Sequence, residues 1–155
     1  HLLRFVKLRK FWRMLNMHIK MYNFGGQMPI RAHEYDAGAD VFPKDSFTIA
    51  PHETKKIPLG IGIEVPVGMT ACIFPRSSLG SKGITTHLAP IDTGYTGEIH
   101  AIVTNTSERE YHIGKNVAVG QLVMFPVVLP YYTFDNINNN RGDGAFGSTG
   151  HADVE

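Results

Sequence analysis

Residues 141–150 read Arg-Gly-Asp-Gly-Ala-Phe-Gly-Ser-Thr-Gly and combine a guanidinium group, hydroxyls and several glycines. Guanidinium N–H groups pair well with phosphate oxygens, and glycine-rich backbone exposes N–H groups that can surround an anion. The composition therefore indicates a phosphate-binding segment. A plain flexible terminus is the alternative interpretation, because Gly- and Ser-rich chain ends are commonly disordered.

A second set of anion-binding side chains follows an apolar run that ends at Phe74. Residues 75–80 read Pro-Arg-Ser-Ser-Leu-Gly and offer one positive fork beside two hydroxyls. Such a turn can hold phosphate oxygens where the N–H groups of a short helix point the same way. The same residues could instead cap a helix, since Ser is favoured at the N-cap and Pro beside it.

Asp92 and Tyr95 lie close together in a predicted turn, where residues 91–97 read Ile-Asp-Thr-Gly-Tyr-Thr-Gly. If the turn lies over a bound nucleotide, the Asp92 carboxylate can act as a general base that takes a proton from an attacking water. The ring of Tyr95 can then lie flat against a sugar. The structural alternative is an Asp that hydrogen-bonds the backbone of its own turn.

Gln121 interrupts an apolar run at residues 120–126. An amide in a buried strand must find hydrogen-bond partners, and a phosphate oxygen would be one. No competing set of metal ligands is visible, because the histidines lack metal-ligand spacing and Cys72 has no second thiol.

The composition limits the classes of protein to consider. A chain of 155 residues with 43% hydrophobic and 19% charged residues predicts a single globular domain. A net charge of +1 favours no nucleic-acid partner, and the apolar runs are shorter than the roughly 20 residues that span a bilayer. With one cysteine and therefore no internal disulfide, a cytoplasmic protein is expected.

Short runs of β-branched and aromatic residues, bounded by Gly, Pro, Asn and Asp, predict the strands that must position these groups. The predicted strands are 46–49, 55–65, 69–74, 98–104 and 117–128, and residues 77–82 could hold one short helix. Glycines and prolines between positions 58 and 68 suggest bends in a curved sheet. We therefore expect an all-β sandwich or barrel with at most one short helix.

Three regions are expected along the chain. Residues 1–16, basic and rich in Leu, Phe and Trp, are interpreted as an upstream or non-native extension ahead of Met17. A basic amphipathic helix is the alternative for this segment. Residues 17–134 would form the β domain, and residues 135–155 would be a flexible, glycine-rich lid.

The order and spacing of these stretches resemble the motifs of the trimeric dUTPase (deoxyuridine 5'-triphosphate nucleotidohydrolase) family, in its phage or Gram-positive bacterial form. Ala-Gly-Ala-Asp-Val at residues 37–41 is similar to the first motif, and Gln121 is the centre of the fourth. The second, third and fifth resemble residues 75–79, 91–97 and 141–150. The resemblance implies a β-clip or jelly-roll-like barrel that forms a homotrimer with active sites shared between subunits.

For the reaction, the resemblance implies hydrolysis of dUTP to dUMP and pyrophosphate by attack of water on the α-phosphorus. This reaction keeps uracil out of DNA and supplies dUMP for dTMP synthesis. Asp92 would hold the 3′-hydroxyl and activate the water, and Tyr95 would stack on the deoxyribose. The implied phosphate ligands are Arg76, Ser77, Ser78 and Gln121. A neighbouring subunit would close the site with Arg141, Phe146, Gly147, Ser148 and Thr149.

The implied cofactor is Mg²⁺, which prefers an octahedral shell of phosphate oxygens and waters. The triphosphate would carry this ion without direct protein ligands. Asp40 would either act on the metal's waters or simply support its own turn.

The chain departs from the family pattern at two places. Ala145 stands where the fifth motif most often has glycine, and Gly114 lies two residues farther from Gln121 than the fourth motif leads us to expect. Two alternative functions remain open: a dCTP deaminase of the same fold, and a dUTPase-like regulatory protein that binds a repressor.

Overall fold

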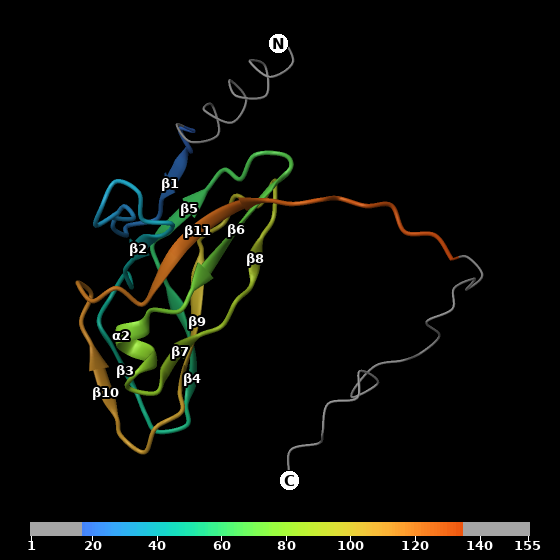
Figure 1. Ribbon diagram of the computed structural model, residues 1–155. Helices are drawn as coiled ribbons and strands as arrows, with labels where there is room; N and C mark the ends of the chain where they lie inside the picture. The colour runs from blue at the N-terminus through green and yellow to red at the C-terminus, as the bar shows by residue number, and fades with distance from the viewer. Residues whose placement is uncertain (1–16, 135–155) are drawn as a thin grey trace.

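The computed structural model describes residues 17–134, which form a domain of short strands (Figure 1). This part of the chain contains eleven strands and one helix of four residues, α2 (Ser77–Gly80). The strand pairs between them are antiparallel. The sequence-based prediction of an all-β domain with one short helix is confirmed.

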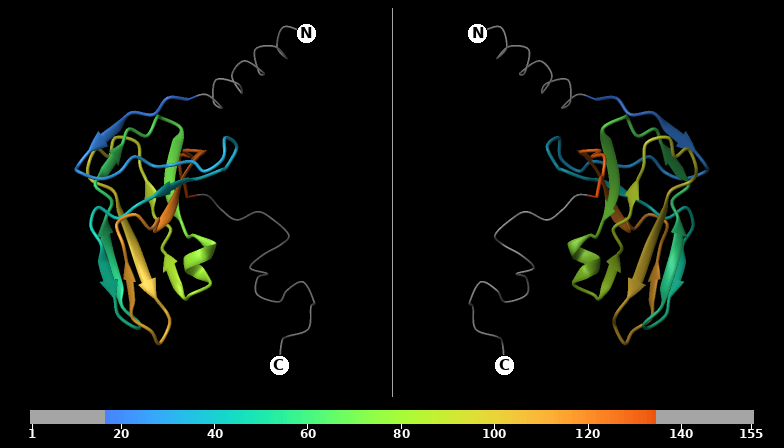
Figure 2. Two further views of the ribbon diagram at one scale, coloured as in Figure 1. Left: turned by 90° about the vertical axis from the view of Figure 1, so that its left-hand side faces the viewer. Right: turned by 90° about the vertical axis from the view of Figure 1, so that its right-hand side faces the viewer.

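Two sheets make up most of the domain. The larger sheet has the strand order β2-β11-β6-β8, with β2 (Ala39–Val41), β11 (Gly120–Pro126), β6 (Met69–Phe74) and β8 (Pro90–Ile91). The smaller sheet has the order β4-β9-β7, with β4 (Thr54–Pro58), β9 (His100–Asn105) and β7 (Ile84–Thr86). Helix α2 contacts β7 at the edge of the domain (Figure 2).

Two smaller pairs complete the described domain. They join β1 (Met21–Asn23) to β5 (Ile61–Ile63) and β3 (Phe47–Ile49) to β10 (Tyr111–Ile113). Most of these strands have three residues, so each is stabilised mainly by what it packs against rather than by its own length.

The core is built from the inward faces of strands that are far apart in the sequence. In β9 the side chains of Ala101, Val103 and Asn105 are buried, whereas the alternate residues are more exposed. Burying one large apolar side chain contributes about 1.5–3 kcal/mol. The other fully buried aliphatic residues are Val41, Ile49, Leu59, Ile63, Ile84 and Val119.

The backbone crosses itself closely at Gly26 and Gly60. The Gly60 carbonyl accepts hydrogen bonds from the backbone N–H groups of Phe24 at 2.9 Å and Gly26 at 2.8 Å. A Cβ on Gly26 would lie 2.0 Å from the Leu59 carbonyl oxygen, and a Cβ on Gly60 would lie 2.3 Å from the Gly26 nitrogen. Gly60 also has a φ of +67°, which L side chains rarely adopt. Neither position has room for a side chain.

The predicted strands agree with the structure in most places. The prediction 69–74 coincides with β6, and 46–49, 98–104 and 117–128 overlap β3, β9 and β11. The prediction of one continuous strand over 55–65 is wrong, because the chain bends at Leu59 and Gly60 to meet Gly26 and forms two strands, β4 and β5. The sequence analysis missed β1, β2, β7, β8 and β10, which have only two or three residues each.

Asn105 is a fully buried polar side chain that connects separate loops. Its Nδ2 donates to the carbonyl oxygens of Ile49 at 3.3 Å, Ala50 at 2.9 Å and Arg109 at 2.6 Å. Its Oδ1 accepts from the Ser107 backbone N–H at 3.0 Å and hydroxyl at 2.8 Å. Because every polar atom of this side chain is paired, the network holds the ends of β3, β9 and β10 in one arrangement.

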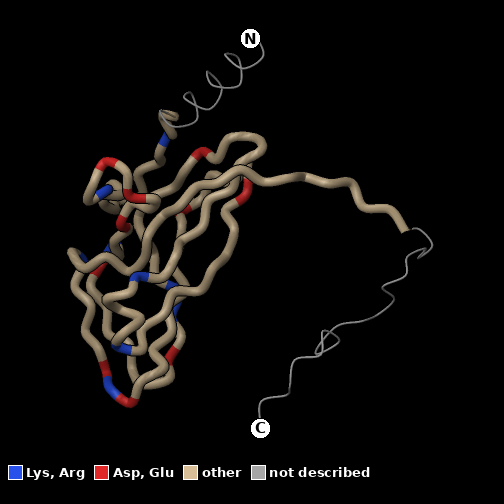
Figure 3. The backbone as a smooth tube through the Cα atoms, in the orientation of Figure 1, with Lys and Arg blue, Asp and Glu red and all other residues tan. Residues whose placement is uncertain are grey.

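Acidic and basic side chains are intermixed along the described chain (Figure 3). In the exposed loop of Glu108, Arg109 and Glu110, acidic and basic residues follow one another directly. Among residues 17–134, no helix has the length and apolar character needed to cross a membrane.

Candidate active site

Asp40, Arg76 and Gln121 form a cluster at one end of the larger sheet. The register of β2 and β11 places Asp40 directly opposite Gln121, and Phe74 of β6 lies on the other side of Gln121, two residues before Arg76. Gln121 Nε2 donates to Asp40 Oδ1 at 3.1 Å, and Arg76 Nη2 lies 3.1 Å from Asp40 Oδ2. The side chains are 19% (Asp40) and 30% (Arg76) exposed. The guanidinium is therefore held in a defined position at the surface.

Small residues allow the strands of this cluster to approach. A Cβ on Gly38 would lie 2.8 Å from Cβ of Gln121, and a Cβ on Gly120 would lie 2.4 Å from Cγ2 of Ile73. Gly114 belongs instead to a turn, where its carbonyl accepts a hydrogen bond from the Val117 N–H at 2.9 Å. The strand register, rather than the spacing from Gly114, therefore determines where Gln121 lies.

The turn after β6 presents two serines beside Arg76. Leu79 is buried and anchors α2, whereas Ser77 and Ser78 are exposed. Arg76 occupies the N-cap position, and no side chain caps the helix. The helix-cap interpretation of these serines is therefore wrong, and their hydroxyls face solvent next to the guanidinium.

Asp92 and Tyr95 lie in a tight turn between β8 and β9. The Tyr95 backbone N–H donates to the Asp92 carbonyl at 3.2 Å, and Gly94 supplies the positive φ of +86° that the turn requires. The Thr93 hydroxyl donates to the Pro66 carbonyl at 3.1 Å. This contact anchors the turn to the loop that precedes β6.

The ring of Tyr95 folds back over the base of its own turn. Its hydroxyl donates to the Glu98 carbonyl oxygen at 2.8 Å. A Cβ on Gly97 would lie 2.7 Å from the Tyr95 Oη, so a side chain at Gly97 would displace the ring. The Tyr95 side chain is thereby held in a fixed position although the residue is 46% exposed.

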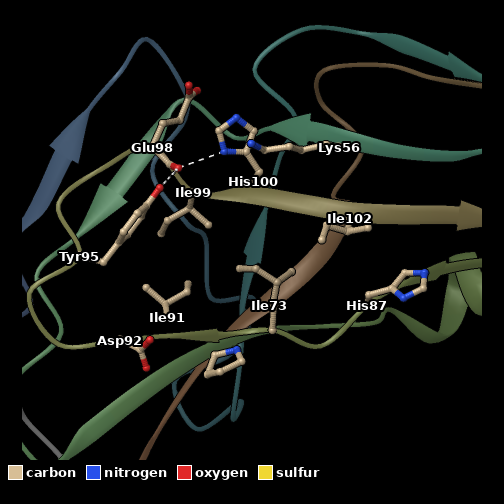
Figure 4. A pocket seen from close by; sticks show the side chains of 12 residues that line it. Lys56, Ile73, His87, Ile91, Asp92, Tyr95, Glu98, Ile99, His100 and Ile102 are labelled. Carbon is tan, nitrogen blue, oxygen red and sulfur yellow. Dashed lines mark hydrogen bonds between the residues drawn. The ribbon is translucent and has the colours of Figure 1, made fainter.

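A cavity of about 260 Å³ opens beside this turn (Figure 4). The turn contributes Asp92 and Tyr95, and the apolar part of the lining includes Ile73, Ile91 and Ile99. Concave sites with apolar walls and a few polar groups are typical of small-molecule binding. The cavity therefore suits a small organic molecule such as a nucleoside, with the Asp92 carboxylate at its rim.

Four polar residues of this cavity were missed by the sequence analysis: Lys56, His87, Glu98 and His100. In Figure 4, Lys56 and His100 lie side by side on the wall opposite Asp92. Both lie on the outward face of strands in which buried and exposed residues alternate. A polar residue is expected at such a position, so the sequence gives no sign that it lines a cavity. Only the folded sheet shows that they face one cavity.

The predicted site residues fall into two groups at opposite ends of β6. Asp92 follows Ile91, which pairs with Ala71 near the beginning of β6, whereas Arg76 lies beyond its far end. At about 3.3 Å per residue, the stretch from Thr70 to Arg76 spans roughly 20 Å. One copy of the chain therefore does not bring Asp92 and Arg76 together.

The remaining predicted residues lie outside the part of the chain that the structure describes: Arg141, Phe146, Gly147, Ser148 and Thr149. Within residues 17–134, no three His, Cys, Asp or Glu side chains gather closely enough to form a metal-binding cluster.

The fold and the site together define an all-β domain with a carboxylate-bearing cavity for a small molecule and a separate Arg-Ser corner suited to phosphate. The dUTPase family profile matches residues 15–150. The chain is 36% identical over 141 residues to a deoxyuridine 5'-triphosphate nucleotidohydrolase of Picosynechococcus sp., covering 86% of this chain and 99% of the relative. The same identity over 141 residues relates it to the enzyme of that name from Clostridium kluyveri, covering 88% and 99%. The chain belongs to the dUTPase family.

Solved structures of phage dUTPases have a similar fold. A variant of Staphylococcus bacteriophage 80alpha dUTPase with dUpNHpp has a TM-score of 0.77 at 24% identity, covering 86% of this chain and 98% of that chain. A variant dUTPase from phage phi11 of S. aureus, described with a structural Mg(II) ion, has a TM-score of 0.74 at 20% identity, covering 80% and 100%. These similarities confirm the jelly-roll-like fold expected from the sequence.

Proposed function

We propose that this chain hydrolyses dUTP to dUMP and pyrophosphate. The observation that carries the proposal is the position of the Asp92 carboxylate, which lies beside Tyr95 at the rim of a cavity suited to a nucleoside. Membership of the dUTPase family and the activity named for the 36%-identical relatives support the same reaction.

In this reaction Asp92 accepts a proton from the water that attacks the α-phosphorus and hydrogen-bonds the 3′-hydroxyl of the sugar. A carboxylate at the rim of the cavity can reach both groups, whereas one buried in its floor could not. A positioned general base contributes about 10²- to 10⁴-fold to a rate. Tyr95 stacks on the deoxyribose, and its ring leaves no room for a 2′-hydroxyl.

The triphosphate is bound by Arg76, Ser77, Ser78 and Gln121. The ion pair with Asp40 supports this role, because it fixes the guanidinium before the substrate arrives. Donors that need no reorganisation during the reaction stabilise developing charge better than mobile ones. The amide of Gln121 is held by the same carboxylate and lies in the same corner.

The two groups of residues act together in a homotrimer, where Asp92 of one copy faces the Arg76 corner of a neighbour. Their separation along β6 in a single chain supports this arrangement. An apolar segment that extends away from the domain after β11 also supports association (Figure 1). Its strongly exposed side chains are Val128, Leu129, Tyr131, Tyr132 and Phe134.

The residues at the Arg76 corner fit Mg²⁺ bound through the triphosphate. The donor set there is oxygen-rich, but both oxygens of Asp40 are already engaged by Arg76 and Gln121. Asp40 is therefore not expected to bind the ion or its waters, and the phosphate oxygens would supply the direct ligands. When bound, the ion neutralises charge on the phosphate oxygens and makes the phosphorus easier to attack.

The site is closed over the substrate by Arg141, Phe146, Gly147, Ser148 and Thr149. Arg141 and the two hydroxyls bind the γ-phosphate, and Phe146 covers the base. Closure excludes water, and hydrogen bonds to the phosphates become stronger in a drier site. The composition of residues 141–150 supports this role.

The substrate assignment is tested by incubating the protein with dUTP, dTTP, dCTP and UTP in the presence of Mg²⁺. Pyrophosphate should be released from dUTP far faster than from the other three. Ammonia from dCTP without pyrophosphate from dUTP would instead indicate the deaminase. The structure gives that alternative little support, because the second carboxylate of the cavity, Glu98, accepts the Gly60 backbone N–H at 2.9 Å.

A further inference from the structure

The carbonyl oxygen of Glu98 accepts two side-chain hydrogen bonds, one from each side (Figure 4). The Tyr95 hydroxyl donates to it at 2.8 Å, and the His100 Nδ1 lies 3.0 Å from it. A carbonyl oxygen has two lone pairs, so it can accept both donors at once. The ring that lies in the proposed sugar site is thereby connected to a histidine on the adjacent strand.

His100 can act only as a donor in this contact. A carbonyl oxygen has no proton to give, so Nδ1 must carry the hydrogen, which fixes one tautomer of the neutral ring. The protonated ring also has a hydrogen on Nδ1. Both forms of the ring can therefore donate this hydrogen bond.

Glu98 is itself fixed by its surroundings. Its carboxylate Oε1 accepts the Gly60 backbone N–H at 2.9 Å. The next residue, Ile99, donates its N–H to the Ile61 carbonyl at 2.8 Å, and its own carbonyl accepts the Leu59 N–H at 3.0 Å. These contacts place Glu98, and the two side-chain donors complete the contacts of its carbonyl oxygen.

We propose that His100 is a positioning residue for substrate binding: through the Glu98 carbonyl, it holds the ring of Tyr95 at the angle that the sugar requires. Without the imidazole, the carbonyl loses one of the two side-chain donors that define its direction. The Tyr95 hydroxyl then loses a defined acceptor, and its half-exposed ring gains freedom. The inference rests on the proposed function, and it concerns affinity for the nucleoside rather than proton transfer at Asp92.

The test measures kcat and KM for dUTP and the Kd of dUMP for His100→Ala and His100→Asn. In the alanine variant, loss of one neutral hydrogen bond should raise KM and Kd by roughly 3- to 10-fold. Its kcat should stay within about twofold, because Asp92 is untouched. His100→Asn places an amide donor near the position of Nδ1 and should restore most of the affinity. His112→Ala is the matched control, because His112 lies on the remote β3–β10 pair with its Nδ1 3.2 Å from the Thr48 hydroxyl.

A double-mutant cycle with Tyr95→Phe tests the connection directly. Tyr95→Phe removes the other donor to Glu98 and should itself raise KM. His100→Ala should add little in that background, because the two side chains act through one acceptor. If His100→Ala alone is poorly folded, the KM values of Tyr95→Phe and His100→Asn still test the inference: Tyr95→Phe should raise KM, and His100→Asn should keep it near that of the unmodified protein.

Two outcomes would overturn the inference: an unchanged KM in His100→Ala, or full additivity of the two substitutions. An equal loss in His100→Asn and His100→Ala would also contradict it, because the restored donor would then have no effect. Failure of the proposed function looks different, since the unmodified protein would then release no pyrophosphate from dUTP.

Discussion

Asp40 Oδ2 lies 3.1 Å from Arg76 Nη2, although Asp40 belongs to β2 and Arg76 follows β6 far along the sequence. The carboxylate meets the guanidinium because β11 pairs with both β2 and β6. Its other oxygen accepts from the amide of Gln121. The Asp40 carboxylate therefore orients two donors that are proposed to bind phosphate, the guanidinium of Arg76 and the amide of Gln121.

Replacing Asp40 with Asn should slow dUTP hydrolysis, because Arg76 loses the carboxylate that positions it. Loss of a charge-assisted contact is expected to lower kcat/KM by about 10- to 100-fold. The Mg²⁺ concentration that gives half-maximal rate should change by less than about twofold, because Arg76 and Gln121 already engage both oxygens of Asp40. A Mg²⁺ titration of the two proteins measures this, and a large shift would instead assign Asp40 to a metal-bound water.

Replacing Asp92 with Asn should preserve binding and remove most of the turnover. The amide can still hydrogen-bond the 3′-hydroxyl but cannot accept a proton from water, so kcat should fall by about 10²- to 10⁴-fold. Pyrophosphate release and dUMP titration separate the two effects. Asp45→Asn, at an exposed position outside the cavity, is the matched control. Turnover close to that of the unmodified protein would contradict the role of Asp92.

Deleting residues 141–155 should leave the β domain folded and slow its reaction. The core described in residues 17–134 is formed by these residues packing against one another, so the melting temperature should change little. The loss of Arg141 and the adjacent hydroxyls should reduce kcat/KM for dUTP. Full activity in the truncated protein would show that the segment has no part in catalysis.

Replacing Asn105 with Asp should strongly destabilise the domain. The new side chain has the same shape, but it points a carboxylate oxygen at the carbonyls of Ala50 and Arg109 instead of a donor. An unpaired buried polar group costs about 1–3 kcal/mol, and more when it is charged. Urea unfolding measures the change, and a loss below about 1 kcal/mol would show that these contacts contribute little.

Glu53 should make part of the domain's stability depend on pH. The Ala50 N–H bonded to its carboxylate at 2.8 Å, and Lys55 at 3.2 Å, hold the pKa of Glu53 below its ordinary value of 4.5. The stabilisation is therefore complete above that value and is lost as the pH falls through the lower folded-state pKa. Glu53→Gln should lower the melting temperature at pH 7, and the difference should shrink below about pH 4. Glu110→Gln, at an exposed position, is the matched control.

The sequence predicted the long strands and the motif residues because both carry local signals. Met69–Phe74 is a mostly apolar run and coincides with a strand, whereas Ala39–Val41 is a strand because distant segments lie beside it, above all β11. The glycines and prolines near Gly60 predicted a bend, but not the division into two strands, since its cause is the approach of Gly26 from another part of the chain.

The same limit applies to the site. Arg76, Asp92 and Gln121 could be singled out from their neighbours in sequence, but their distribution over two ends of β6 depends on the strand register. Glu98 and His100 were missed because each acts through a backbone carbonyl or amide, which any residue type possesses. Such contacts become visible only when the sheet is assembled.

The crossing of Gly26 and Gly60 has a consequence for how this enzyme family can diverge. The Gly60 backbone N–H donates to the Glu98 carboxylate, and the Glu98 carbonyl accepts the Tyr95 hydroxyl. A glycine near the start of the domain, which does not line the cavity beside Asp92, thus shares in the selective pressure on substrate recognition. Lineages that acquire a side chain at position 26 must rebuild the neighbouring loop at the same time, so change there should come as a coordinated block rather than one residue at a time.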